Sequence, residues 1–589
     1  MRKRRWRWVA PLCAALVFAV ALAARWRWAA TWDGPTFQPQ PDALEYAASA
    51  QALAQSGKFY LQVGPVPARP HYAPGWPLLI AAALVVGVPP QQLWRLTGLC
   101  GAVLAVVLAA AARRSVLVLA GERAAPESAA WGALAGGLVA GIGWALAPAA
   151  VAVGTTLLSD EPATLAAWSS VLLLAGGMLR SVSPLGRRGL WLWAGASGVA
   201  GGLAASMRPI EGALLVAAEL PLIIYAGLTL GLRGVLRLLG AWCAGAALPA
   251  VLTAAILVHS GLPALAWTGY RFWSLPGARF FDSTFAVAGN PDLPAALDGR
   301  VRPHLELAAL ALFGLPGLPW DWYLGRLWPL LGWLATPWLW ALSSAGQAGT
   351  STQPPLCGNS LPQLRRLAGS RSSSVAERHS PEGCRHIYHC RQPLVLCGRA
   401  AFPGGLSRQV APGRSRPGAP DRSREPRRAA IDLLRWVAVG LGCWTLCRVA
   451  LLSCYFYPAG RFYLPAQAVP LLLLATASGF AAAGGGRWLR RAGCAAAAGL
   501  LAALLLDFAS FRRGIAPGDP PGRVFKRFRR WIELTDQQRA AQGVPFDPLA
   551  AQALGLMDPE TVAGIREWGE LPPTYHVLRL RKKGLLPPD

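Results

Sequence analysis

The sequence has little charge for its length. Only 15% of its 589 residues are charged, whereas soluble domains carry roughly a quarter. Hydrophobic residues make up 54% of the chain, and the mean hydropathy is +0.35. This composition excludes an ordinary soluble globular domain and favours an integral membrane protein.

Acidic residues are also scarce, and the cysteines do not form a pattern that indicates disulfides. The chain has 57 Lys and Arg against 29 Asp and Glu, a formal net charge of +28. The arginines flank apolar runs, which is typical of membrane topology and argues against a nucleic-acid partner. The eleven cysteines are scattered, several within apolar runs, where a thiol behaves as a small apolar residue. No disulfide framework is predicted.

The N-terminus also lacks a convincing signal cleavage site. A basic start and an apolar stretch over 9–24 are followed directly by Arg25, Trp26, Arg27 and Trp28, instead of small residues. We interpret this segment as a retained first span with aromatic and basic anchors, whose basic end stays in the cytoplasm.

Long apolar runs are what the sequence does have, and a helix that crosses the hydrocarbon core needs roughly 20 apolar residues. The fold class predicted is an all-α polytopic membrane protein of about eleven transmembrane helices, with a large first extracytoplasmic loop and a small C-terminal extracytoplasmic tail. The predicted spans are 9–30, 94–112, 129–150, 162–179, 189–206, 210–231, 238–259, 326–344, 431–453, 463–484 and 492–509.

Charge along the chain supports this arrangement. With the N-terminus inside, the loops predicted to be cytoplasmic are rich in arginine, as the positive-inside rule requires. The connections that hold Asp42, Ser159–Glu161 and the 260–300 loop then all lie outside. The arginines of the inner loops are Arg113, Arg114, Arg123, Arg180, Arg187, Arg188, Arg233, Arg237, Arg487, Arg490 and Arg491.

Composition divides the chain into four parts. Arg, Ser, Pro and Gly dominate one of them, 345–430, which is predicted to be disordered because it cannot bury enough apolar surface; a shifted reading frame is the alternative. The tail holds a basic amphipathic stretch at 523–534. The four parts are a transmembrane catalytic module at 1–344 with the first external loop at 31–93, the low-complexity segment 345–430, C-terminal transmembrane helices at 431–510 and a small extracytoplasmic tail at 511–589.

Three groups of residues carry candidate chemistry. The first is Asp42, with Glu45 and Tyr46 close by, where the chain leaves the first span. A carboxylate in so apolar a protein is a candidate for acid–base chemistry, although Asp42 at this position is also suited to capping a helix. The second is Leu-Leu-Ser-Asp-Glu-Pro at 157–162, between two predicted spans. Its adjacent acids, Asp160 and Glu161, suit either a helix N-terminus or the binding of a cation or an acceptor hydroxyl.

The third group is cationic. Arg208 lies between two apolar runs, and Arg461 lies in the aromatic stretch 455–465. Arginine offers a planar fork of donors suited to phosphate oxygens and is costly at membrane depth without a partner. For Arg208 the alternative is an ion pair with Glu211 or Glu161. For Arg461 it is an interfacial anchor among tyrosines.

The order of these motifs resembles the GT-C membrane glycosyltransferases, the group with the protein O-mannosyltransferases and the lipid A aminoarabinose transferases. It runs from Asp-x-x-x-Tyr at 42–46 through Tyr-x-Pro-Gly-x-Pro-Leu-Leu at 72–79 to Ser-Asp-Glu-Pro. Gly-Leu-Ala-x-x-x-Arg-Pro at 202–209 and Arg-Phe-Tyr-Leu-Pro at 461–465 follow. The resemblance covers roughly 1–260 and 431–509.

This resemblance implies roles for single residues. Asp42 would contact the acceptor and act as base, and the acid of the second connection would be Glu161 or Asp160. Arg461, with Tyr463, would lie near the lipid phosphate of the donor. Our reading of the charges adds Arg208 to that phosphate site.

The function predicted is therefore transfer of a sugar from a polyprenyl-phosphate donor to a glycan, lipid or protein acceptor at the outer face of the cytoplasmic membrane. A divalent cation held by Asp160 or Glu161 could assist the reaction and stays open, and no other cofactor is predicted. The alternatives are a polytopic transporter or flippase, and a remnant of the transferase inactivated by the 345–430 segment. A transporter would carry intramembrane charges near mid-span.

Overall fold

The computed structural model is nearly all helical in the residues that it describes. These are 2–30, 41–63, 66–68, 70, 72–89, 92–121, 124–181, 189–264, 328–348, 424–453, 460–484 and 486–513, with isolated positions at 305, 308, 309 and 312. The chain divides into two compact units, 1–344 with 423–589 and 345–422.

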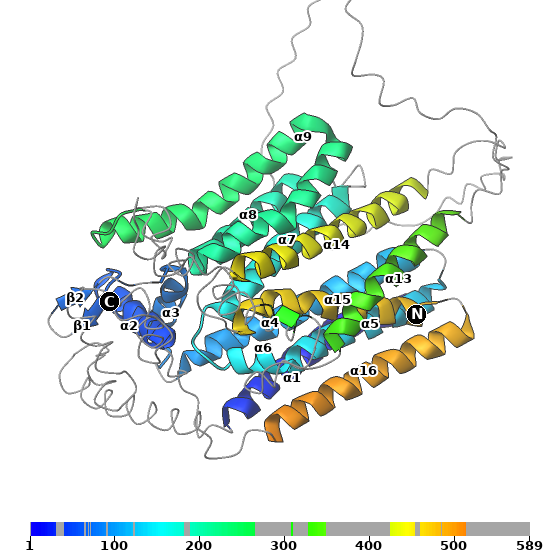
Figure 1. Cartoon of the computed structure of the whole chain (residues 1–589), viewed down its shortest axis with the longest axis horizontal. Helices are drawn as coiled ribbons and strands as arrows, with labels where there is room; N and C mark the ends of the chain where they lie inside the picture. The colour runs from blue at the N-terminus through cyan, green and yellow to red at the C-terminus, as the bar shows by residue number, and fades with distance from the viewer. Residues whose placement is uncertain are drawn as a thin grey trace, which may run out of the picture. The chain divides into compact units, whose positions relative to one another are not determined.

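The elements follow the apolar runs of the sequence (Figure 1). Helices cover at least part of each predicted span. The elements are α1 (Arg2–Ala30), α2 (Pro41–Ser56), β1 (Leu61–Val63), β2 (Val66–Ala68), α3 (Gly75–Val85), α4 (Trp94–Ala120), α5 (Pro126–Leu146), α6 (Pro148–Val153), α7 (Asp160–Ser181), α8 (Leu190–Met207), α9 (Pro209–His259), α13 (Trp328–Ala348), α14 (Arg424–Ser453), η8 (Gly460–Tyr463), α15 (Leu464–Ala482) and α16 (Arg487–Arg513).

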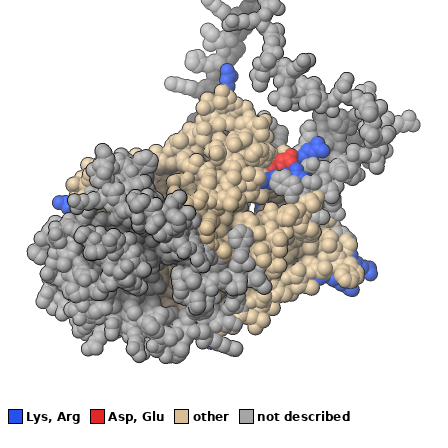
Figure 2. Space-filling model, in the orientation of Figure 1, with Lys and Arg blue, Asp and Glu red and all other residues tan. Residues whose placement is uncertain are grey.

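Eight helices within the described residues are long and apolar enough to cross a membrane. Large apolar side chains such as Leu16, Leu228 and Leu248 are exposed on them, as expected where lipid is the solvent. Figure 2 shows a described surface that is almost entirely uncharged, with Lys, Arg, Asp and Glu confined to small patches. The protein is therefore a multi-pass membrane protein. The count of about eleven spans stays a prediction.

Two predicted spans, 210–231 and 238–259, lie in the single helix α9, which folds back at Gly231. That residue has φ 70° and ψ 174°, a conformation accessible to glycine without a side-chain clash. On α8, Gly195 lies against Ala241 and Gly202 lies against Pro249. The second half of α9 therefore runs parallel to α8 and antiparallel to its own first half.

The predicted span 129–150 is interrupted. α5 ends at Leu146, and α6 begins at Pro148, which has no N–H to continue the helical hydrogen bonds. The segment predicted to be the first external loop holds the short helices α2 and α3 and an antiparallel hairpin of β1 and β2 that we did not predict. The predicted amphipathic stretch at 523–534 and most of 345–430 lie outside the described residues.

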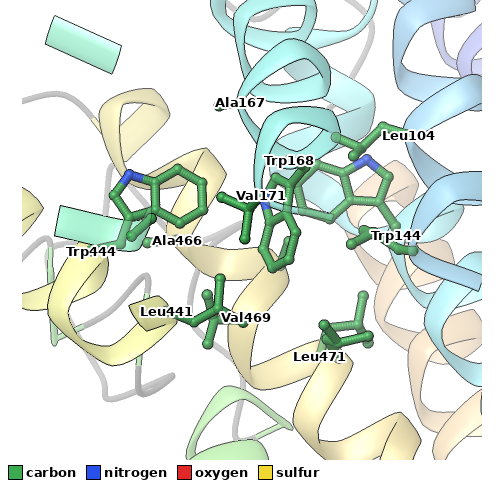
Figure 3. Packing of buried hydrophobic residues seen from close by; sticks show 14 of the residues in the cluster. Leu104, Trp144, Ala167, Trp168, Val171, Leu441, Trp444, Ala466, Val469 and Leu471 are labelled. Atoms are coloured by element: carbon green, nitrogen blue, oxygen red, sulfur yellow. The ribbon is translucent and has the colours of Figure 1, made fainter. Parts of the chain in front are cut away.

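Tryptophans fill the core at the level where α7, α14 and α15 meet (Figure 3). The rings of Trp168 and Trp444 lie edge to face, with centroids 5.6 Å apart. The indole N–H of Trp168 donates to the carbonyl of Pro465 at 3.0 Å, and the Trp144 side chain is fully buried nearby. This packing fixes the start of α15, and with it η8, against α7.

Candidate functional site

The first turn of α7 contains both acids of the second predicted group. Ser159 directly precedes the helix, and its carbonyl accepts a hydrogen bond of 3.0 Å from the N–H of Ala163. Asp160 and Glu161 follow as the first two helical residues, where the helix dipole favours negative charge. All three side chains are buried, so their polar groups need partners inside the protein.

The two adjacent carboxylates contact different arginines. Glu161 accepts a hydrogen bond of 2.6 Å from Arg25 of α1, and Asp160 pairs with Arg208 between α8 and α9. The alternative considered for Arg208, an ion pair with Glu211 or Glu161, named the wrong acids, because these pair with Arg448 and Arg25. Successive residues of a helix point about 100° apart, so adjacent acids reach opposite neighbours.

A third pair joins α9 to α14. The guanidinium of Arg448 donates hydrogen bonds to both carboxylate oxygens of Glu211, from Nη1 to Oε1 at 3.0 Å and from Nη2 to Oε2. Nη1 of Arg448 also donates to the carbonyl of Phe462 in η8 at 2.8 Å. Both charged side chains are only 1% exposed. Arg448 thus holds the backbone of η8, the element that carries Arg461 and Tyr463.

Aromatic contacts continue this network. The guanidinium carbon of Arg208 lies 5.3 Å from the ring centroid of Phe462, and that of Arg461 lies 5.4 Å from the same centroid. Tyr463 is fully buried. Four of the predicted site residues, Asp160, Arg208, Arg461 and Tyr463, are therefore linked through direct contacts or one short helical turn.

Helix α2 docks on the same end of the bundle. The hydroxyls of Tyr46 and Ser159 lie 2.9 Å apart, and the rings of Tyr46 and Tyr72 are 5.0 Å apart. Asp42 lies in the first turn of α2, which begins at Pro41, so the helix starts ahead of it. The side chain of Asp42 lies outside what the structure describes. One helical turn of backbone separates it from Tyr46.

The carboxylates leave little room for a divalent cation. No group of three His, Cys, Asp or Glu capable of holding a metal occurs among the described residues. Asp160 and Glu161 each face an arginine instead, and that positive charge compensates theirs. A cation between them would have to displace an arginine.

Three buried charged residues were not predicted from the sequence. Arg25 was read as an interfacial anchor, yet its side chain is 1% exposed; Trp26, next to it, is exposed as an anchor would be. Arg448 and Glu219 were not considered. The signal for both was available, because each is an ionisable residue inside an apolar run.

Comparison with known proteins gives a weak likeness. No protein-family model matches the chain, and no curated protein matches it. Among solved structures, it is similar to ArnT from Cupriavidus metallidurans bound to undecaprenyl phosphate, at 14% identity and a TM-score of 0.41, over 94% of this chain and 72% of that one. The apo state of ArnT gives 15% identity and a TM-score of 0.33, over 79% and 76%. Values this low carry no argument about the reaction.

Proposed function

We propose that this protein is a membrane glycosyltransferase that moves a sugar from a polyprenyl-phosphate donor to an acceptor hydroxyl or amine. One observation supports it above all. Contacts at one end of an apolar helix bundle connect Ser159–Asp160 to Arg208 and, through Phe462, to the Arg461 motif. These are the motifs on which the resemblance to GT-C glycosyltransferases rests.

In this proposal Asp42 is the base. The acceptor's nucleophilic atom attacks the anomeric carbon while Asp42 takes its proton. The bond between that carbon and the phosphate oxygen breaks, and polyprenyl phosphate leaves with the electron pair. Attack from the face opposite the leaving group inverts the anomeric configuration. Asp160 or Glu161, near the acceptor, would orient it.

The leaving phosphate gains negative charge, so fixed positive charge beside it lowers the barrier. Arg208 and Arg461, with Tyr463, are the proposed phosphate contacts. Of the three ion-paired arginines in this network, Arg208 is the one whose exposure best suits contact with a phosphate. Its side chain is 14% exposed, whereas those of Arg25 and Arg448 are 1% exposed.

The proposed location is the outer face of the cytoplasmic membrane, with the N-terminus inside. The positive-inside pattern supports this orientation. The acceptor is a glycan, a lipid or a protein, and lipid around the bundle would receive the prenyl chain. No divalent cation is needed in this scheme, since arginines already supply positive charge.

The test is sugar transfer in membrane fractions supplied with radiolabelled polyprenyl-phosphate sugars. Asp42→Asn should lose nearly all label transfer, because the base is gone. Glu45→Gln, on the same helix, is the matched control and should retain it. Equal transfer by the wild type and Asp42→Asn would remove Asp42 from the role of base.

A transporter or flippase is the second candidate, and Glu219 is the observation in its favour. It is an acid in the middle of a span and is 3% exposed, and such residues mark substrate or ion pathways in transporters. Label that crosses the membrane of reconstituted vesicles without transfer to any acceptor would favour this reading. An absence of both activities would favour the inactive remnant.

A further inference from the structure

The carboxyl group of Glu219 lies at mid-depth among three helices, far from the site described above. Glu219 is ten residues into α9, which corresponds to roughly 15 Å along the helix from the end that carries Arg208 and Glu211. Ser170 of α7 and Ser197 of α8 lie equally deep from the same end. The hydrocarbon core is about 30 Å thick, so this cluster lies near its middle.

The hydrogen-bond partners of Glu219 are two serine hydroxyl groups. Its Oε1 lies 2.6 Å from Ser170 Oγ and 3.4 Å from Ser197 Oγ. Ser170 Oγ also lies 2.9 Å from the carbonyl of Ser197. The indole of Trp242, in the second half of α9, lies near the same carboxyl, but its N–H makes no hydrogen bond to a described residue. Packing is close here, since a Cβ at Gly201 would lie 3.2 Å from both Ser170 Oγ and Trp242 Cζ2.

No cation compensates Glu219 within the part of the chain that the structure describes. The arginines on the helices around it make other contacts: Arg448 with Glu211, Arg208 with Asp160, Arg435 with Asp432 and Arg180 with the ring of Trp193. Arg233 and Arg237 lie on the returning half of α9 after the bend at Gly231, and both are exposed, whereas Glu219 is buried. Asp160, Glu161 and Glu211, in contrast, each face a guanidinium.

The number of hydrogens available for these contacts distinguishes a protonated from an ionised Glu219. A serine hydroxyl has one hydrogen to donate, so Ser170 cannot donate to both Glu219 and the Ser197 carbonyl. If Glu219 carries a proton, it donates to Ser170 Oγ and Ser170 donates to the Ser197 carbonyl, and both short contacts become hydrogen bonds. An ionised Glu219 would be a buried charge with Ser170 Oγ at 2.6 Å, Ser197 Oγ at 3.4 Å and the Trp242 indole nearby. No described cation would compensate it, which is a large cost in hydrocarbon.

We propose that Glu219 is a proton-binding site inside the membrane, occupied in the folded protein, which links α7, α8 and α9 as a neutral hydrogen-bonded chain. α7 begins with Asp160, and α9 begins directly after Arg208 and has Glu211 in its first turn. A link between these helices at mid-depth therefore fixes the distance between the site residues at their ends. The inference does not depend on the proposed reaction.

Infrared difference spectroscopy on the purified full chain in detergent tests it. The wild type should show a carboxylic-acid C=O band from mildly acidic to mildly alkaline pH, and this band should be lost in Glu219→Gln. Glu127→Gln, which removes an exposed acid, is the matched control and should change only carboxylate bands. A carboxylate band lost in Glu219→Gln, instead of an acid band, would overturn the proposal.

Thermal unfolding gives a second readout. The folded protein holds a proton that a water-exposed glutamic acid releases above about pH 4.3, so the stability of the wild type should fall as pH rises. The slope should be smaller in Glu219→Gln. Equal slopes would contradict a bound proton. If Glu219→Gln does not fold, Ser170→Ala keeps the acid but removes its acceptor, and its C=O band should move to higher frequency. An unmoved band would also contradict the proposal.

Discussion

Arg25 donates a hydrogen bond of 2.6 Å to Glu161, and this pair joins the first helix of the chain to the helix that begins with the candidate acids. The two side chains are 1% and 0% exposed. A buried ion pair gains little over a well-packed apolar pair, but loss of one partner leaves an uncompensated charge. Substitution of Arg25 or Glu161 alone should therefore be more damaging than substitution of both.

Removal of either partner should destabilise the protein strongly. Arg25→Met or Glu161→Met alone should each cost about 3–5 kcal/mol, since the remaining charge stays buried. The double substitution should recover most of that loss, because no charge remains. Thermal unfolding in detergent measures all three. A double variant as unstable as the sum of the singles would show that the two charges are not coupled.

Gly154 makes room for this ion pair. A Cβ at Gly154 would lie 2.5 Å from Arg25 Nε and 2.7 Å from Glu161 Oε2, distances that real Cβ contacts do not reach. Gly154→Ala should therefore separate the pair and lower stability by about 1–3 kcal/mol, the usual cost of overpacking. Gly176→Ala on α7 is the matched control, since a Cβ there meets nothing within 4 Å. Equal thermal shifts in the two variants would count against this role of Gly154.

Helices could be predicted from the sequence, whereas the pairing of charges could not. An apolar run of about 20 residues identifies a span by itself, and helices cover at least part of each predicted run. The hairpin of β1 and β2 has only three residues a strand, too few for an alternating pattern. One acid such as Glu219 hardly alters the hydropathy of its run.

Arg25 shows the same limit. Alternating Arg and Trp after an apolar run is typical of an interfacial anchor, and Trp26 and Arg27 fit that role because they are exposed. Arg25 is on the opposite face of α1 and points into the bundle. Which face packs inward depends on the neighbouring helices, information that one sequence does not contain.

Arg448 should act as a positioning residue for η8 if the proposed transfer reaction is correct. Arg448→Lys keeps a charge near Glu211 but loses the planar fork that also reaches the carbonyl of Phe462. Loss of a hydrogen bond to a charged group costs about 1.5–3 kcal/mol, which corresponds to roughly a 10- to 150-fold lower kcat/KM for the donor.

Arg435→Lys is the matched control on α14. Its ion pair with Asp432 is partly exposed, and such pairs contribute at most about 1 kcal/mol. Donor kinetics in membrane fractions should therefore change little. An effect of Arg448→Lys on acceptor KM alone would contradict a role at the donor phosphate.

The hydrogen bond between Tyr46 and Ser159 should couple helix α2 to the site. Tyr46→Phe removes the hydroxyl that lies 2.9 Å from Ser159 Oγ, at a cost of about 1 kcal/mol in stability. Because α2 carries Asp42, the same change should lower sugar transfer. Tyr225→Phe removes a comparable bond, from the Tyr225 hydroxyl to the carbonyl of Ala429 at 2.9 Å, and should lower stability by a similar amount without loss of transfer. Equal transfer by Tyr46→Phe and Tyr225→Phe would mean that the docking of α2 does not position the base.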